Sequence, residues 1–346
     1  MAGSYRNILI IKPSSMGDIV LALPALSALR RNFPDAKIRW LVRSEFVPLL
    51  KGHPHLDEII LFDRRFLGKA WYNPRAFVAL ILFIRKLRSS EFDLVLDLQG
   101  LFRTAILGWL SGCKSRFGMA AAREFAHIFY TDKIPQNRDS IHLVDYYLKI
   151  VQAAGASDIG VRFVMPSASS CRKTEVGSHY AVFVPGSAHI DKRWPAERFA
   201  ELAGRVSSQF GLSVVAVGTA AEKDVVEQIR KLSSVPIINL AGATDISELT
   251  ALLRTAELVV SNDTGPGHIA AALGVPIVMI FGRSNPVRVA PYGRKYCVAA
   301  VEPDGRGFKA DSTNPKHNIK NITVDEVYQK VCEQLNRDSS IGTRGS

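Results

Sequence analysis

The sequence has few cysteines and no long apolar run. Its four cysteines stand far apart and form no CxxC pair, which argues against a local zinc site and against a disulfide framework. The longest apolar run, Ala76 to Ile84, has nine residues, about half of the ~18 that a membrane-spanning helix needs. The N-terminus lacks the apolar core of a signal peptide. We therefore expect a soluble, cytoplasmic protein.

Acidic residues are also under-represented. The chain has 44 lysines and arginines against 32 aspartates and glutamates, a formal net charge of +12. Such an excess indicates an anionic partner: a nucleic acid, a membrane surface or a phosphorylated substrate. Hydrophobic residues make up 47% of the 346, enough for a sizeable core and for about two domains.

Short β-branched runs alternate with helical patterns along the chain, which predicts parallel sheets with covered faces. The alternation starts at residue 7, stops at a polar stretch and starts again at residue 180. We predict an α/β fold of two Rossmann-like domains whose sheets face a central cleft. The domains span residues 5–166 and 179–322, with a linker at 167–178 and a final helix at 323–337 that we expect to pack back toward the first domain.

The loop that follows the first strand, Lys12-Pro-Ser-Ser-Met-Gly-Asp18, lies at the carboxyl edge of the predicted sheet, where ligands bind. Asp18 stands at the start of a helix. It fits two roles: a carboxylate that caps the helix, or one that faces a cleft and takes a proton from a bound hydroxyl.

Two loops of the second half have the composition of anion sites. The segment PGSAHIDKRWP offers Ser187, Lys192 and backbone N–H groups, the donors that a diphosphate needs, although a solvated loop with Trp194 plugging the core is the alternative. The segment SNDTGPGH places Asp263, Thr264, Gly265 and His268 between a strand and a helix. His268 is either a ligand donor or a packed, capping histidine. Asp263 and His268 lack a third ligand, so we expect no metal site.

Glu222 follows a strand where dinucleotide folds place an acid on ribose hydroxyls, but taken alone we interpret it as an exposed glutamate at a helix start. Basic residues gather in the first half and bracket the apolar helix 76–84, which we interpret as a core helix, with a membrane-leaning one as the alternative. No nucleic-acid-binding module accompanies these charges. The basic positions include Arg64, Lys69 and Arg123.

Five segments together resemble the ADP-heptose:lipopolysaccharide heptosyltransferases of glycosyltransferase family 9: KPSSMGDIVLALPAL, DLQGLFRTA, AREFAHIFY, PGSAHIDKRWP and SNDTGPGHIAAALGVPIVMIFG. The mid-chain segments look most like the enzymes that add the first heptose. The resemblance implies a GT-B fold and an inverting transfer of L-glycero-D-manno-heptose from ADP-heptose to Kdo of the lipid A–Kdo inner core, at the cytoplasmic face of the inner membrane.

The resemblance also implies roles for single residues. Asp18 matches the general base, and Lys192 a catalytic lysine at the donor phosphate or sugar. The donor site would further comprise Ser187, Glu222, Asp263, Thr264, Gly265 and His268. Arg64, Lys69 and Arg123 match basic acceptor-binding positions. No cofactor or metal is implied, and no oligomeric state is predicted.

Two other functions remain open on the residues alone. One is a family member that uses another sugar nucleotide or a later core acceptor, as an enzyme adding the second heptose does. The other is a dinucleotide-dependent oxidoreductase, although neither opening strand is followed by GxGxxG. A binding module for anionic lipid would account for the charge but would leave Asp18 and the DTG loop without a role.

Overall fold

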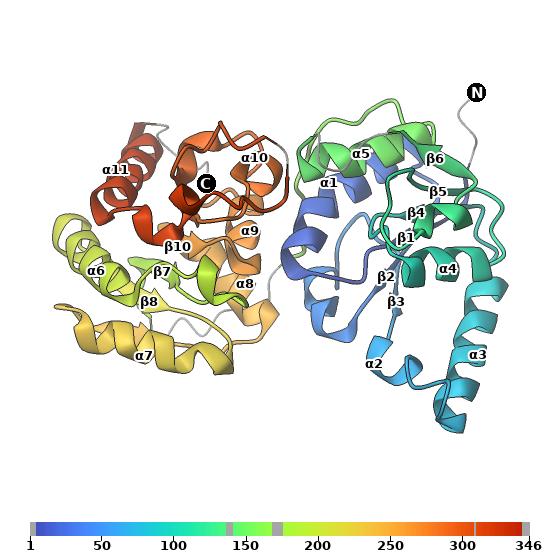
Figure 1. Cartoon of the computed structure of the whole chain (residues 1–346), viewed down its shortest axis with the longest axis horizontal. Coiled ribbons are helices and arrows are strands. Elements are labelled where there is room, and N and C mark those ends of the chain that lie inside the picture. Colours follow the sequence, from blue (N-terminus) through green and yellow to red (C-terminus); the bar gives the residue numbers. More distant parts are fainter. Residues whose placement is uncertain (1–4, 136–140, 168–175, 308, 341–346) are drawn as a thin grey trace. The chain divides into compact units, whose positions relative to one another are not determined.

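The computed structural model describes residues 5–135, 141–167, 176–307 and 309–340. Of residues 338–340 it describes the backbone alone. The chain divides into two compact units, residues 1–167 and 168–346 (Figure 1). Most of the predicted linker, residues 168–175, lies outside the described residues. Each unit is described by itself.

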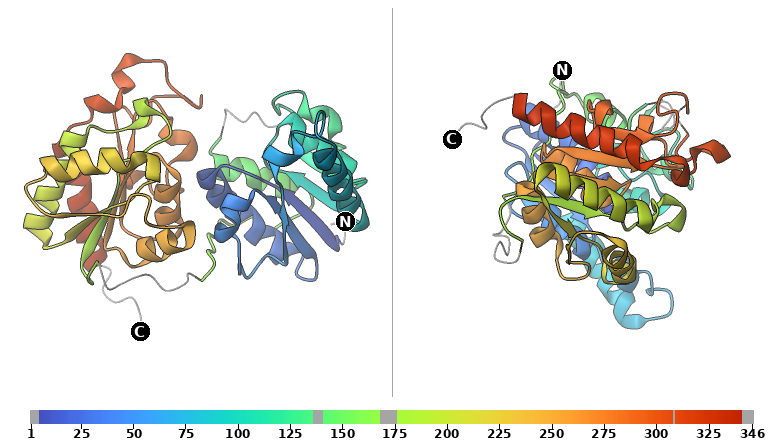
Figure 2. Two further views of the ribbon diagram at one scale, coloured as in Figure 1. Left: turned by 90° about the horizontal axis from the view of Figure 1, so that it is seen from below. Right: turned by 90° about the vertical axis from the view of Figure 1, so that its left-hand side faces the viewer.

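The first unit is a six-stranded sheet with helices on both faces (Figures 1 and 2). All neighbouring strands are parallel, in the order β3-β2-β1-β4-β5-β6. The strands are β1 (Asn7–Ile11), β2 (Lys37–Val42), β3 (Glu58–Leu61), β4 (Leu94–Asp97), β5 (Arg116–Met119) and β6 (Asp132–Ile134). The helices are α1 (Met16–Asn32), α2 (Arg64–Leu67), α3 (Pro74–Ser89), α4 (Phe102–Leu110) and α5 (Leu143–Ala153).

The second unit repeats this plan. Its six parallel strands have the order β12-β11-β10-β7-β8-β9. The strands are β7 (Tyr180–Val184), β8 (Ser213–Ala216), β9 (Ile237–Asn239), β10 (Leu258–Asn262), β11 (Ile277–Phe281) and β12 (Val298–Ala300). The helices are α6 (Ala196–Phe210), α7 (Lys223–Leu232), α8 (Ile246–Thr255), α9 (Gly265–Ala272), α10 (Pro286–Val289) and α11 (Val324–Ser340).

Counted within each unit, both sheets have the Rossmann order 3-2-1-4-5-6. The strand order reverses between β1 and β4 in the first unit and between β7 and β10 in the second. Ligands of open parallel sheets bind outside the carboxyl ends of the strands at such a reversal. The prediction of two Rossmann-like α/β units is confirmed, and it directs attention to the loops after these four strands.

Continuous apolar strands form the cores, as expected for sheets that are covered on both faces. In the second unit, Trp194 is 2% exposed, packs edge-on against Phe199 and donates its indole N–H to the carbonyl of Ile322 at 2.8 Å. The interpretation of Trp194 as a core plug is therefore confirmed. A buried indole N–H without a hydrogen-bond acceptor would destabilise the folded state, and the carbonyl of Ile322 provides that acceptor.

The final helix, α11, begins with a capping box. Both the backbone N–H and the hydroxyl of Thr323 donate to the Glu326 carboxylate. Val327 and Val331 of α11 are fully buried in the core of the second unit, where the helix packs on α6 and β11. The core of the second unit therefore covers the apolar face of α11, and the expected packing toward the first domain stays a prediction.

The helix after β10 begins inside the SNDTGPGH segment rather than after it: α9 starts at Gly265 and has Thr264 as its N-cap residue. Gly265, Pro266 and Gly267 therefore lie in the first turn rather than in a loop. Gly267 is required for packing, since a Cβ there would lie 2.8 Å from Ser261 Oγ and 3.1 Å from Met279 Cε.

Candidate functional site

Asp18 lies in the first turn of α1, directly after the loop that leaves β1. Its Oδ2 accepts hydrogen bonds from the backbone N–H of Ser15 at 3.3 Å and from the Ser15 hydroxyl at 3.2 Å. This is the acidic half of a capping box, so the capping interpretation is confirmed. The side chain is nevertheless 27% exposed. A second role at a substrate is thus compatible with its place in the helix.

A buried lysine stands behind this carboxylate. Lys12, at the end of β1, is 1% exposed, and its Nζ lies 3.6 Å from Asp18 Oδ2 and 5.3 Å from the centre of the Tyr147 ring. A buried ammonium needs an opposite charge, and Asp18 supplies it. The pair fixes one oxygen of Asp18 and leaves the carboxylate partly exposed. Sequence reasoning quoted Lys12 in the motif but gave it no role.

The neighbouring strand end carries a second buried acid that the sequence analysis did not single out. Asp97 ends β4 and accepts four hydrogen bonds: from the backbone of Gln99 and Gly100, from the Thr104 hydroxyl at 3.0 Å and from the Tyr130 hydroxyl at 2.7 Å. Burial raises the pKa of Asp97, while these donors oppose the rise. The arrangement shapes the DLQG loop, so Asp97 is an organising residue.

In the second unit, three predicted residues converge at the end of β10. Asp263 follows the strand, and its two oxygens face different partners. Oδ2 lies 3.4 Å from Lys192 Nζ, and Oδ1 lies 3.4 Å from His268 Nε2. Lys192 Nζ also lies 4.0 Å from Asp311 Oδ1. The structure therefore joins the loop after β7 to the first turn of α9 through one carboxylate.

The electrostatics of this cluster favour the charged form of Asp263. Burial alone would raise the pKa of Asp263, but its hydrogen bond with His268 and the nearby charge of Lys192 together lower that pKa to about 2. The Nδ1 atom of His268 is buried and makes no hydrogen bond within the described part of the chain. Asp263 is thus ionised at neutral pH, next to a lysine that is 24% exposed.

This shift predicts an acid-labile component of stability. The folded pKa of Asp263 lies below the ordinary value near 3.9, so the cluster contributes fully above about pH 4 and loses its contribution as the pH falls through about 2. The contribution is about 2 kcal/mol. Urea titrations across this range are expected to show that Asp263→Asn lacks this pH-dependent contribution. Asp224→Asn, which changes an exposed carboxylate, should lose stability in acid as the parent chain does. If Asp263→Asn also lost as much stability in acid as the parent chain, the assignment would be contradicted.

Asn262 holds the two loops of this site together, and sequence reasoning missed it. Its amide is fully buried, donates to the carbonyl of Pro185 at 2.7 Å and accepts from the backbone N–H of Trp194 at 3.2 Å. Asn262 thereby connects to Pro185, which lies 77 positions earlier in the chain, and to Trp194, which lies 68 positions earlier. Asn262 stands beside Asp263 in the SNDTG segment, but its partners are too distant in sequence to have been inferred.

Ser187 and Glu222 lie in the loops after β7 and β8. The carbonyl of Ser187 accepts two hydrogen bonds from the Arg193 guanidinium, at 2.9 and 2.7 Å, which stabilises this loop. Glu222 accepts from the backbone and hydroxyl of Thr219. Its carboxyl group lies over Gly186, where a Cβ would come within 2.2 Å of it. The helix-start interpretation of Glu222 is therefore confirmed, and its contact with Gly186 places it beside the Ser187 loop.

Thr264 and Gly265 form the start of α9. The Thr264 hydroxyl lies 3.1 Å from that of Ser261 and 3.3 Å from the carbonyl of Asn262, so it does not cap its own helix. The first N–H groups of an eight-residue helix then lie next to Asp263 and Lys192. Such a helix start, with a lysine and a hydroxyl beside it, has the donors that bind a phosphate.

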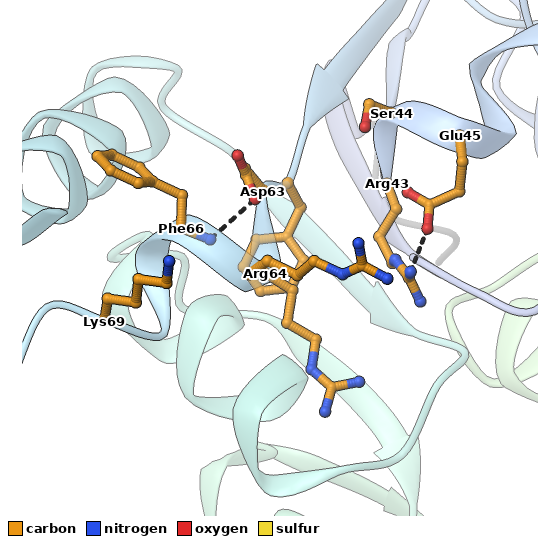
Figure 3. Close-up of a pocket in the computed structure, with 9 residues that line it drawn as sticks. Arg43, Ser44, Glu45, Asp63, Arg64, Phe66 and Lys69 are labelled. Atoms are coloured by element: carbon orange, nitrogen blue, oxygen red, sulfur yellow. Dashed lines mark hydrogen bonds and ion pairs between the residues drawn. The ribbon is translucent and has the colours of Figure 1, made fainter.

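The first unit also has a basic pocket of about 470 Å³ (Figure 3). Arg64 and Lys69, both predicted, line it together with Arg43 and Arg65, which were not. Arg43 pairs with Glu45, and the Asp63 carboxylate caps α2 through the Phe66 N–H at 2.9 Å. The pocket is thus rich in cations and fits anionic groups. Arg123 is not among its lining residues; it lies on the exposed loop between β5 and β6.

In the described residues no group of three or more His, Cys, Asp or Glu is placed to hold a metal ion. The paired Asp263 and His268 are bound to each other and to Lys192. The ammonium group of Lys192 lies 3.4 Å from the Asp263 carboxylate. It balances the negative charge of Asp263, as a bound metal ion would.

Fold and sites together define a class: a two-domain, GT-B-like α/β protein with polar residues gathered at the strand reversal of each sheet. A family model described as "Glycosyltransferase family 9 (heptosyltransferase)" matches residues 81–318, more than half of the chain. The chain belongs to glycosyltransferase family 9 and is a glycosyltransferase. This result sets aside the oxidoreductase alternative.

Curated relatives and solved structures agree with this assignment. The chain is 30% identical over 307 residues to lipopolysaccharide heptosyltransferase 1 of Pseudomonas aeruginosa, covering 83% of this chain and 82% of that one. It is 26% identical to heptosyltransferase 1 of Salmonella typhimurium, covering 94% and 99%. The Escherichia coli heptosyltransferase WaaC with ADP-2-deoxy-2-fluoro heptose superposes with a TM-score of 0.75 at 25% identity, covering 94% and 99%. These relatives support heptosyltransferase activity in lipopolysaccharide core synthesis.

Proposed function

We propose that this chain transfers L-glycero-D-manno-heptose from ADP-heptose to the Kdo of the lipid A–Kdo inner core and inverts the anomeric centre. The observation that carries the proposal is the Lys192–Asp263–His268 cluster at the start of α9. A lysine, a hydroxyl and free helix N–H groups suit the diphosphate of an ADP-sugar. The relatives named as heptosyltransferase 1 favour the first-heptose acceptor.

The donor would occupy the strand ends of the second unit. Lys192, Ser187 and the N–H groups at Thr264 and Gly265 would bind the diphosphate and stabilise the charge that develops on ADP as it leaves. Asp263 would hold Lys192 in place and approach the sugar. His268 would hold the other oxygen of Asp263 and so fix the carboxylate at the donor site. Glu222, beside Gly186, would meet the ribose hydroxyls.

Asp18 of the first unit would act as general base. It takes the proton of a Kdo hydroxyl while that oxygen forms a bond to the anomeric carbon of heptose. The bond between the anomeric carbon and the phosphate oxygen breaks in the same step, and ADP leaves with its electron pair. The Ser15 and Lys12 contacts keep one carboxylate oxygen fixed, so the carboxylate has a defined orientation.

The acceptor would bind through the basic residues of the first unit. Arg64 and Lys69 line one cation-rich pocket, which suits Kdo carboxylates or lipid A phosphates. Arg123 would be a separate contact on its own loop. A lipid-linked acceptor would place the enzyme peripherally at the cytoplasmic face of the inner membrane; no described helix is long and apolar enough to cross a membrane.

Mass spectrometry tests this function directly. The protein is incubated with ADP-heptose and either a Kdo-lipid A acceptor or the same acceptor already carrying one heptose. We expect one added heptose, and one released ADP, on the Kdo acceptor only. Transfer to the heptosylated acceptor alone would instead identify an enzyme of the second-heptose type, and no transfer to either would overturn the proposal.

A further inference from the structure

An apolar surface on α3 and the turn before it has no partner among the described residues of its own unit. We call it the α3 face; six large side chains form it: Trp71, Tyr72, Phe77, Val78, Ile81 and Leu82. Trp71 is 85% exposed and packs edge-on against Tyr72, with ring centres 4.7 Å apart. Isolated exposed apolar residues are ordinary, but a contiguous group of this kind marks an interaction surface.

The attachment of α3 explains why this face is open. Only Ala76 and Leu87 of the helix are fully buried, and Phe83 packs against Phe62 with ring centres 6.1 Å apart. The helix therefore rests on the sheet along one side, next to α2 (Figure 1). Phe77 and Ile81, like Val78 and Leu82, are four residues apart and share the other side. Our interpretation of 76–84 as an ordinary core helix is wrong.

The charge around the α3 face has one sign. Residues 64–90 contain seven lysines and arginines and no aspartate or glutamate. Arg75 and Arg85 stand three residues from Val78 and Leu82, one at each end of the apolar stretch, and both are exposed. An apolar helix face bordered by cations, with Trp and Tyr beside it, is the composition of a helix that lies in a membrane interface.

We infer that the α3 face binds the surface of an anionic bilayer. In this arrangement α3 lies in the plane of the membrane, its apolar side chains enter the headgroup–acyl boundary, and Trp71 and Tyr72 sit at headgroup depth. The seven cations gain from negative lipids. A second copy of the chain is a poorer occupant, because a symmetric pair would bring two sets of like charges together.

This inference rests on the proposed function only in that a lipid-linked acceptor would lie at such a surface. The binding is measured without turnover, so the two proposals fail separately. The probe is a set of vesicles, either of phosphatidylcholine alone or with added phosphatidylglycerol. The full-length chain is expected to sediment with the anionic vesicles, and less as salt is raised, because screening weakens the attraction of surface charges.

The decisive variant is the pair Val78→Asp and Leu82→Asp, which places two charges on the face. We expect at least a tenfold loss of binding to anionic vesicles. Leu232→Asp is the matched control, because Leu232 is 51% exposed on the second unit, and it should bind as the parent chain does. Arg75→Gln with Arg85→Gln is a second variant, which keeps the apolar face and is expected to weaken binding and its salt dependence.

Three results would overturn the inference. They are unchanged vesicle binding in Val78→Asp/Leu82→Asp, an equal loss in Leu232→Asp, or a parent chain that forms a dimer which the double variant abolishes while neither binds vesicles. Thermal melting shows that each variant is folded. Transfer to a short acceptor without lipid chains is expected to be unchanged in Val78→Asp/Leu82→Asp, since neither residue belongs to the proposed donor or acceptor sites.

Discussion

Asp18→Ala is expected to lower kcat by about 10²–10⁴-fold and to leave the affinity for ADP-heptose close to that of the parent chain. A positioned general base contributes about this factor to the rate. The donor contacts that we propose all lie in the second unit, so removing Asp18 should leave the dissociation constant for the donor unchanged. Steady-state kinetics with saturating acceptor, together with calorimetry of ADP binding, measure both quantities.

The control must account for the second role of Asp18 in the capping box of α1. Losing such a cap costs about 1 kcal/mol of stability. Glu326 holds the same position in the capping box of α11, with Thr323 as its partner. Glu326→Ala should therefore lose an equivalent cap, without leaving a buried lysine unpaired as Asp18→Ala does, and keep its kcat. Equal kcat values for Asp18→Ala and Glu326→Ala would remove Asp18 from the mechanism.

Lys192→Ala is expected to weaken ADP binding by about 10- to 150-fold and to lower the rate as well. A hydrogen bond to a charged group contributes about 1.5–3 kcal/mol, and each 1.4 kcal/mol is a factor of ten. The measurement is isothermal titration calorimetry with ADP.

Lys295→Ala is the matched control for this prediction, because Lys295 pairs with Asp304 on the exposed surface of the same unit. Removing Lys192 also leaves Asp263 with His268 as its remaining close partner, so the melting temperature should fall. Lys192→Arg is expected to recover part of the ADP affinity. An ADP affinity in Lys192→Ala equal to that of Lys295→Ala would show that Lys192 does not bind the phosphates.

Residues directly after apolar strands could be predicted from the sequence, because their position depends on a short stretch of chain. Asp18 follows β1, and Asp263 follows β10, each within a few residues of a buried strand. Parallel strands bring such residues to one edge of a sheet, so the candidate clusters followed from the order of elements.

Residues whose role depends on distant partners escaped prediction. Asp97 depends on Tyr130, 33 positions away, and Asn262 on Pro185, 77 positions away. Lys12 has a local partner, but its burial against Tyr147 comes from the packing of a helix more than a hundred residues on. Such contacts are set by how elements assemble, and no local pattern encodes them.

The α3 helix shows a further limit. Its apolar run has the composition of a core helix. Composition alone does not show which side of a helix packs against the sheet. Only Ala76 and Leu87 are fully buried, and Phe77, Val78, Ile81 and Leu82 are exposed. The basic residues at both ends of the run were the available signal, since a helix buried on all sides seldom has exposed arginines three residues from its apolar positions.

The configuration of the transferred sugar tests the central claim, a single displacement driven by one carboxylate, most directly. Nuclear magnetic resonance of the product formed from ADP-heptose and a short Kdo acceptor reports the anomeric centre of the new linkage. The account predicts a configuration opposite to that of the donor. A retained configuration would require two displacements at this carbon, and would contradict Asp18 acting as the base in one step.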